Sequence, residues 1–331
     1  MKYKAFLVTL IVCFLFTTQA FSQVKIIFDT DFGGDVDDLG ALAMLHNFVD
    51  KGECDLLAVM CWSTEQYVVP AMDAVDRFYK HPAIPIGARK GTTHFESWNY
   101  SKPIADKFFH KMSTADAEDA TTLYRKILNK SEDKSIVIVV VGPLMNIQNL
   151  INSGTDSIST LTGKELIDKK VKEFVIMGGQ FPEGNSEWNF DGDMPRVTQF
   201  VLKNISVPVT FTGFEVGAAI KTGEVFNTID VNTPLYTGFM HFSQHAPWIK
   251  ANYKGKILNN STFDQTAVLY AVRNGVGNYW EKVEGGYCEP TKEHGGNKWI
   301  KGPNSNQSYL KLIMQPAKLA TIIESIMLNK F

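Results

Sequence analysis

Residues 24–45 constrain the fold of this chain more than any other stretch. The apolar run Val24–Phe28 leads into five aspartates within ten residues, and leucines then recur at helical spacing. The aspartates are Asp29, Asp31, Asp35, Asp37 and Asp38. This pattern predicts a buried strand, an acidic loop and a helix, in that order.

The acidic loop points to a bound cation. Crowded carboxylates repel, and two unit charges about 4 Å apart cost roughly 4 kcal/mol at an effective dielectric near ~20. A loop that keeps such groups ionised is expected to hold a hard cation, and oxygen-only ligands suit calcium or magnesium. The alternative is a solvated acidic turn without a metal. An EF-hand loop fits less well, because Gly40 stands where its bidentate glutamate belongs.

The first residues predict export. Two lysines precede the apolar run Ala5–Phe16, and the small residues Ala20 and Ser22 follow it. The run is too short to span a bilayer, and the arrangement is typical of a secretory signal peptide. We expect a signal peptide over residues 1–22 and a mature domain over residues 23–331, exported to the periplasm or the extracellular medium. An uncleaved anchor is the alternative.

The overall composition excludes several classes of partner. The 331 residues are 44% hydrophobic and 21% charged, with a net charge of −2. This is ordinary globular composition, so neither a nucleic acid nor, after cleavage, a membrane is an expected partner. The three cysteines that remain after cleavage have neither a disulfide framework nor a zinc-binding spacing.

Strand and helix patterns alternate along the first two thirds of the mature chain. The expected strands are Val24–Phe28, Leu56–Cys61, Ile84–Gly87, Ser135–Val141, Val171–Met177 and Val207–Thr212. The expected helices between and after them include Glu65–Tyr79, Ala115–Asn129, Asp193–Leu202 and Pro316–Leu328. Beyond residue 213 the pattern predicts helices and one strand pair, Tyr279–Cys288 with Lys298–Gly302. The alternation indicates a single α/β domain with a doubly wound, mostly parallel open sheet.

Three polar loops are expected at one edge of this sheet. In such sheets ligands bind beyond the carboxyl ends of the strands. The loops in that position are Asp29–Asp38, Gly142–Asn146 and Gly178–Asn189. They are far apart in the sequence, yet the topology should bring them to one face.

Four motifs in this order resemble the inosine–uridine preferring nucleoside hydrolase family, from Lys25 to about Arg273. They are Asp29-Thr-Asp31-Phe-Gly33 with Asp37-Asp38, Gly142-Pro-Leu-Met-Asn146, Met177-Gly-Gly179 with Glu187-Trp-Asn-Phe190 and Asp193, and Phe263-Asp-Gln-Thr-Ala-Val268. The resemblance implies an N-ribosyl hydrolase on a Rossmann-like sheet that holds one calcium ion. The implied partner is a small-molecule nucleoside, and a homo-oligomer is compatible with the family.

The resemblance also implies roles for individual residues. Calcium would be bound by a carbonyl and three carboxylates, from Met145, Asp31, Asp38 and Asp264. Asp37 would be the general base toward a metal-bound water. The ribose hydroxyls would be held by Asn185, Glu187 and Asn189. Candidates for supporting the metal ligands or contacting the base are Asp29, Asp35, His94 and His241.

The chemistry of N-glycosidic cleavage suits an acidic loop independently of the resemblance. The bond breaks through an oxocarbenium-like state that anionic oxygens stabilise. A water bound to a cation becomes a better nucleophile when a positioned carboxylate takes its proton. A cation with open coordination can also orient the two sugar hydroxyls.

The chain also departs from the family pattern. Many members carry a histidine just before the last metal aspartate to help the base leave, and here that position is Phe263. Trp62-Ser63-Thr64 stands where a ribose-contacting asparagine is expected, and the first loop is longer by residues that include Asp35. A non-hydrolytic relative that binds a ribosyl-like sugar is therefore the second hypothesis.

Two further alternatives concern single motifs. A strand followed by Asp29 and Asp31 is also how magnesium-dependent phosphatases of the haloacid-dehalogenase type begin, although that class does not predict the other motifs. Asp264 alone could serve only as the N-cap of a helix that begins at Gln265.

Overall fold

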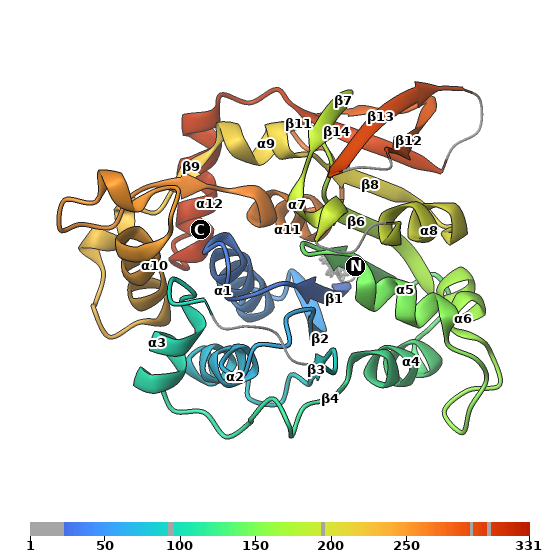
Figure 1. Cartoon of the computed structure of the whole chain (residues 1–331), viewed down its shortest axis with the longest axis horizontal. Coiled ribbons are helices and arrows are strands. Elements are labelled where there is room, and N and C mark those ends of the chain that lie inside the picture. The colour runs from blue at the N-terminus through green and yellow to red at the C-terminus, as the bar shows by residue number, and fades with distance from the viewer. Residues whose placement is uncertain (1–22, 92–95, 193–195, 292–293, 303–305) are drawn as a thin grey trace, which may run out of the picture.

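A computed structural model describes residues 23–91, 96–192, 196–291, 294–302 and 306–331. The predicted signal peptide and His94 lie outside these residues, as does Asp193. The described residues form one α/β domain built on a large sheet with helices on both faces (Figure 1). Among the described residues, no helix combines the length and the apolarity needed to cross a membrane.

The main sheet of the described residues has nine strands in the order β11-β14-β8-β6-β5-β1-β2-β3-β4. Their bounds are β1 Val24–Thr30, β2 Cys54–Cys61, β3 Ile86–Ala88, β4 Glu118–Asp119, β5 Ile136–Val140, β6 Val171–Met177, β8 Val209–Thr212, β11 Trp280–Val283 and β14 Gln307–Leu312. Every neighbouring pair is parallel except β11 with β14. The prediction of a doubly wound, mostly parallel sheet is confirmed.

Apolar side chains cover both faces of the central strands, as parallel strands require. In β1, Ile26 and Phe28 point into one core and Ile27 into the other. The first core contains α1 Asp37–Asp50, α2 Val68–Phe78, α3 Ser101–Lys107, α9 Phe214–Ala219, α10 Pro234–His245, α11 Phe263–Val272 and α12 Pro316–Met327. The second contains α4 Ala120–Lys130, α5 Met145–Asn152, α6 Gly163–Lys170 and α8 Val197–Asn204.

The C-terminal strands differ from the prediction. The expected strand Tyr279–Cys288 is divided at Gly285, whose φ of +76° turns the chain. Its first part, β11, pairs with β14 in the main sheet, and its second part, β12 Gly286–Pro290, pairs with β13 Gly295–Lys301. The predicted strand pair is therefore confirmed for β12 with β13 and wrong for the part that forms β11. The strand β14, whose mixed polar and apolar residues gave no clear signal, was not predicted.

Smaller elements complete the described chain. They are β7 Glu183–Ser186, which pairs with β13, α7 Trp188–Asp191, β9 Lys221–Thr222, β10 Asn260–Ser261 and the 3-10 turns Glu224–Thr228 and Lys250–Asn252. The expected helix from Asp193 begins at Val197 in the described part.

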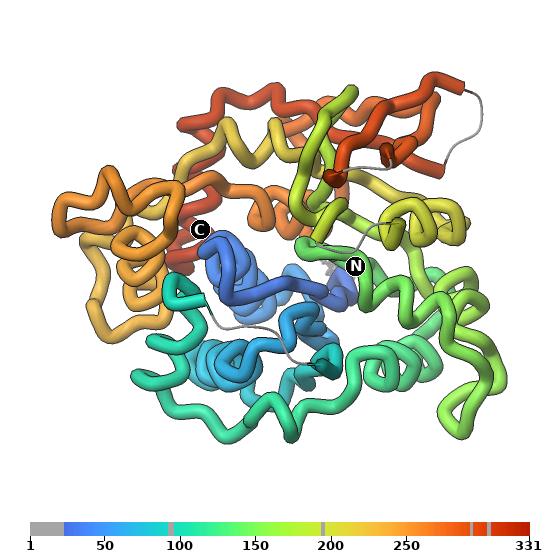
Figure 2. The backbone as a smooth tube through the Cα atoms, in the orientation of Figure 1, coloured from blue at the N-terminus to red at the C-terminus, as the bar shows by residue number. Residues whose placement is uncertain are grey.

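The strand order reverses between β1 and β5. From β1 the chain winds outward through β2, β3 and β4, and from β5 it winds the other way through β6, β8 and β14. In the tube view the first described segments, in blue, accordingly lie at the centre, with later segments on both sides (Figure 2). Ligands of such sheets bind in the crevice at this reversal, beyond the carboxyl ends of the strands. The loops after β1 and β5 flank this position.

Candidate active site

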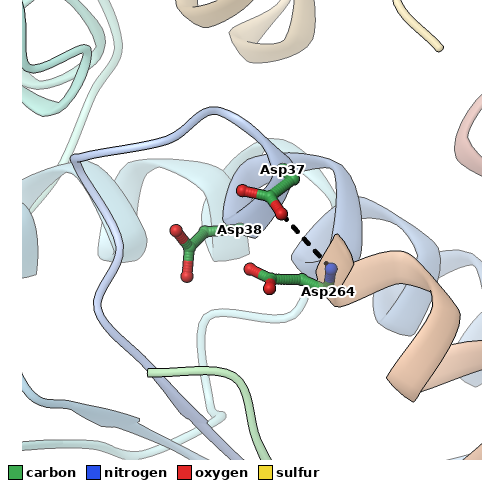
Figure 3. Close-up of side chains that lie close together, drawn as sticks. All are labelled: Asp37, Asp38 and Asp264. Carbon is green, nitrogen blue, oxygen red and sulfur yellow. Dashed lines mark hydrogen bonds between the residues drawn. The ribbon is translucent and has the colours of Figure 1, made fainter. Parts of the chain in front are cut away.

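Three buried carboxylates meet where two helices begin. Asp37 and Asp38 lie in the first turn of α1, and Asp264 lies in the first turn of α11. One carboxylate oxygen of each lies within 4.8 Å of those of the other two (Figure 3). Asp37 Oδ2 also accepts the backbone N–H of Asp264 at 3.3 Å. Residues separated by more than two hundred positions thus form one group, which we call the carboxylate group.

Electrostatics make this group a candidate cation site. Burial first, and then the neighbouring carboxylates, raise the pKa of all three well above the usual value. Within the described part of the chain, no lysine or arginine pairs with them. The positive ends of two helix dipoles offset only part of the repulsion. Clustered oxygen ligands of this kind fit calcium or magnesium.

Capping alone does not explain Asp264. Helix α11 begins at Phe263, one residue before it, and the preceding Thr262 makes no side-chain capping bond. The carboxylate that accepts a backbone N–H at this helix start belongs to Asp37. The interpretation of Asp264 as a simple N-cap is therefore wrong.

Asp31 lies outside the carboxylate group. It is half-buried, and its Oδ2 accepts a hydrogen bond from the indole Nε1–H of Trp188 at 2.9 Å. Burial raises the pKa of Asp31 to about 6. Of the carboxylates predicted to bind metal, the structure brings together Asp38 and Asp264, and it adds Asp37 to them.

Asp29 is held from two sides by polar groups. It is fully buried, and it accepts the Tyr124 hydroxyl at 2.7 Å and the Asn146 amide at 3.0 Å. Burial raises the pKa of Asp29 to about 7, and both hydrogen bonds oppose that shift. These contacts place Asp29 beside the loop after β5, where it supports the acidic loop.

The longer acidic loop is held by glycine and by asparagine. Gly33 has a φ of +117°, which disfavours a side chain there. The Asn260 amide donates to Asp35, and burial raises the pKa of Asp35 to about 6. A Cβ at Gly142 would lie 2.8 Å from the Asp31 nitrogen, so the loops after β1 and β5 are in direct contact.

The residues predicted to bind ribose are placed differently from one another. Asn185 is exposed on β7, whereas Glu187 and Asn189 are buried. Glu187 accepts three backbone N–H groups, and Asn189 Nδ2 donates to the carbonyls of Val141 and Met177. Both side chains thus organise the loop after β6. Their contacts with ribose stay a prediction.

Two further predicted residues lie near the loops without joining the carboxylate group. Met145 opens α5 next to Asn146, and its carbonyl as a metal ligand stays a prediction. His241 lies on α10, where its Nε2 is 3.3 Å from the Ser97 carbonyl and burial lowers its pKa.

Five side chains that contact the acidic segment were not assigned a role from the sequence. They are Thr30, which donates to Asp38, together with Tyr124, Asn146, Trp188 and Asn260. Of these five, Thr30, Asn146 and Trp188 lie within recognised motifs, so these three could have been considered from position alone.

A family model described as inosine-uridine preferring nucleoside hydrolase matches residues 26–303. This chain belongs to that family. Family members are N-ribosyl hydrolases, which cleave the N-glycosidic bond of nucleosides. Membership confirms the resemblance drawn from the four motifs and leaves the phosphatase interpretation without support.

Solved structures share the fold of this nucleoside hydrolase at low sequence identity. The plant nucleoside hydrolase PpNRh1 is 15% identical with a TM-score of 0.67, covering 92% of this chain and 98% of its own. The inosine-uridine preferring enzyme from Bacillus anthracis is 12% identical with a TM-score of 0.64, covering 93% and 99%. The type III effector protein XopQ, solved with adenosine diphosphate ribose, is 12% identical with a TM-score of 0.62, covering 92% of both chains. No curated protein sequence matches.

Proposed function

We propose that this nucleoside hydrolase is calcium-dependent and cleaves ribonucleosides to free base and ribose. The observation that carries the proposal is the carboxylate group, buried where the strand order reverses and without a described cationic partner. Bound there, calcium would orient the ribose diol and make a water more acidic. The oxygen-only donors fit calcium or magnesium, and the family favours calcium.

The general base in this proposal, which takes a proton from the attacking water, is one of two aspartates. The family resemblance implies Asp37, with Asp31 as a ligand. The grouping of Asp37 with Asp38 and Asp264 supports the exchanged roles, in which Asp31 takes the proton from water and Asp37 holds the ion. We favour the exchanged assignment, because the indole of Trp188 holds Asp31 outside the group. In either case the remaining carboxylates stabilise positive charge at the sugar carbon.

The departure of the nucleobase is the step for which the described residues offer least help. The ring of Phe263, next to Asp264, stacks on Phe214 at a centroid distance of 5.1 Å and an angle of 29°. This pair offers an apolar surface and no proton. The second hypothesis, a ribosyl-binding protein without hydrolysis, draws support from this feature and from the adenosine diphosphate ribose bound by the effector protein.

The experiment that separates these hypotheses uses purified protein with inosine, uridine and a nitrophenyl riboside. Ribose release is measured with added calcium and again with a chelator. We expect release that the chelator abolishes and that calcium restores. The absence of release from all three, together with adenosine diphosphate ribose binding by calorimetry, would establish the second hypothesis.

We also propose that the mature protein acts outside the cytoplasm, where it would scavenge nucleosides. The support is the pattern of lysines, apolar run and small residues in the first 22 positions. Mass spectrometry of the protein from the exported fraction should find an N-terminus near Gln23. An intact N-terminus in the cytoplasmic fraction would contradict export.

A further inference from the structure

Helix α7 is too short to be stable by itself and is held by a buried acid. It has four residues, fewer than an isolated helix needs. The Glu187 carboxylate caps it by accepting the N–H groups of Asn189 at 3.0 Å and Phe190 at 3.1 Å. The same carboxylate accepts Gly179 N–H at 2.8 Å, which ties the helix to the turn after β6.

The next two residues anchor α7 to the ends of two strands. Asn189 Nδ2 donates to the carbonyls of Val141, just after β5, and Met177, the last residue of β6, each at 3.0 Å. The Phe190 ring packs against the turn that follows β6, so closely that a Cβ at Gly178 would come within 2.6 Å of the ring. Burial and hydrogen bonding thus fix the backbone of this short helix.

This rigid base presents one largely exposed aromatic side chain. Trp188 is 52% exposed, so burial of its ring is only a partial reason for its position. Its indole Nε1–H donates to Asp31 Oδ2 at 2.9 Å, across 157 positions of sequence. We propose that Trp188 is a positioning residue that fixes the carboxylate of Asp31 for nucleoside hydrolysis. The inference rests on the proposed function, because it needs Asp31 to serve the reaction.

The chemistry of the donor suits this role. An indole N–H bonds to the ionised form of a carboxylate without adding a positive charge that would repel a cation nearby. It occupies one oxygen of Asp31 and leaves the other for a water or an ion. It also holds Asp31 apart from the carboxylate group. In the favoured assignment, one acidic loop can then bind the ion through Asp37 and Asp38 and activate water through Asp31.

The substitution Trp188→Phe tests the proposal by removing the donor and keeping an aromatic ring. A hydrogen bond to a charged group is lost, so we expect kcat for inosine to fall about tenfold or more while KM changes little. Calcium affinity, measured by calorimetry, should stay close to that of the wild type. The control is Trp248→Phe, because Trp248 is 54% exposed and its indole N–H has no partner among the described residues. This control should leave kcat unchanged.

The opposite split of the kinetic constants would overturn the proposal. A raised KM with an unchanged kcat in Trp188→Phe would mean that the ring binds substrate and that its N–H has no positioning role. Unchanged constants would equally refute it.

A second measurement does not depend on hydrolysis. The chain has six tryptophans, and the spectrum of Trp188→Phe assigns the indole N–H signal of Trp188 in ¹⁵N-labelled protein. In Asp31→Asn this signal should shift while the other indole signals stay in place. If it does not shift, the contact is absent and the proposal falls, even if nucleosides are hydrolysed. If it shifts in a protein that hydrolyses nothing, the proposed function fails and the positioning role fails with it.

Discussion

The buried carboxylates at the two ends of helix α1 have opposite kinds of neighbours. At its N-terminal end, Asp37 and Asp38 face another carboxylate and find no cation among the described residues. At its C-terminal end, the buried His46 Nε2 lies 2.8 Å from Asp76 Oδ1, and the two side chains are 0% and 1% exposed. The carboxylates at the N-terminal end therefore repel one another, whereas the carboxylate at the C-terminal end is paired with a histidine.

The paired end continues into a chain of hydrogen bonds. The Nδ1 atoms of His46 and His81 are 2.9 Å apart, and His81 Nε2 is 3.1 Å from Asp50 Oδ1. The ring of Tyr79 stacks on His46 at 4.9 Å. Because each carboxylate here meets an imidazole, this end needs no ligand. The contrast teaches that the unpaired acids, and not buried acids in general, mark the site.

The largest expected effect comes from breaking the unpaired end. We predict that Asp38→Asn lowers kcat for inosine by about a thousandfold or more, because the proposed calcium site would lose a ligand and its charge. The calcium-free variant should unfold at a higher temperature than the calcium-free wild type, since one repelling charge is gone. Steady-state kinetics and thermal unfolding measure the two effects. A normal kcat in this variant would show that Asp38 is not part of the active site.

Removing the carboxylate of the histidine pair should lower the free energy of unfolding and leave kcat unchanged. We predict that Asp76→Ala destabilises the fold by about 3 kcal/mol, because a buried imidazole loses its partner. Urea unfolding gives that free energy. The kcat of the folded protein should match the wild type. A large loss of kcat without a loss of stability would mean that the two ends of α1 are coupled.

A smaller effect tests the apolar wall next to the unpaired end. Phe263→His adds a potential proton donor beside Asp264, and general acid catalysis supports turnover. We predict that kcat for inosine rises by about tenfold, while a nitrophenyl riboside, whose leaving group needs no proton, changes little. Parallel assays of the two substrates measure the ratio. An equal change for both would show that proton donation does not limit the reaction.

The smallest effect concerns pH. Burial and mutual repulsion raise the pKa of the carboxylate group in the folded state, so the calcium-free fold loses stability as pH rises through these values. In the proposed site, bound calcium would offset that repulsion. We predict that calcium raises the unfolding temperature by about 5 °C more near pH ~8 than near pH ~5.5. Calorimetric scans at the two pH values measure the difference. The same gain at both would contradict charge repulsion as the cause.

The sequence predicted the parts of the molecule whose signals are local. β5 is apolar throughout and is fully buried, and the density of aspartates after β1 marked the acidic loop. The C-terminal strands were predicted only in part: β12 pairs with β13 as expected, whereas β11 pairs with β14, an arrangement that depends on the turn at Gly285 and on partners far away.

The contacts around the acidic loop could not be predicted for the same reason. Tyr124 and Asn146 reach Asp29 across 95 and 117 positions, and Trp188 reaches Asp31 across 157. Only tertiary packing decides such pairs. The grouping of Asp37 with Asp264 also comes from the packing of α1 against α11, and it changes which aspartate we expect to be the base.

Calcium titration of chelator-treated protein, by calorimetry, tests the central claim most directly. We predict that the wild type binds one ion per chain and that Asp37→Asn weakens its affinity by about a hundredfold, because Asp37 belongs to the carboxylate group. No binding by the wild type would contradict the calcium site itself. Full affinity in Asp37→Asn with turnover lost would contradict the exchanged roles and return Asp37 to the role of general base.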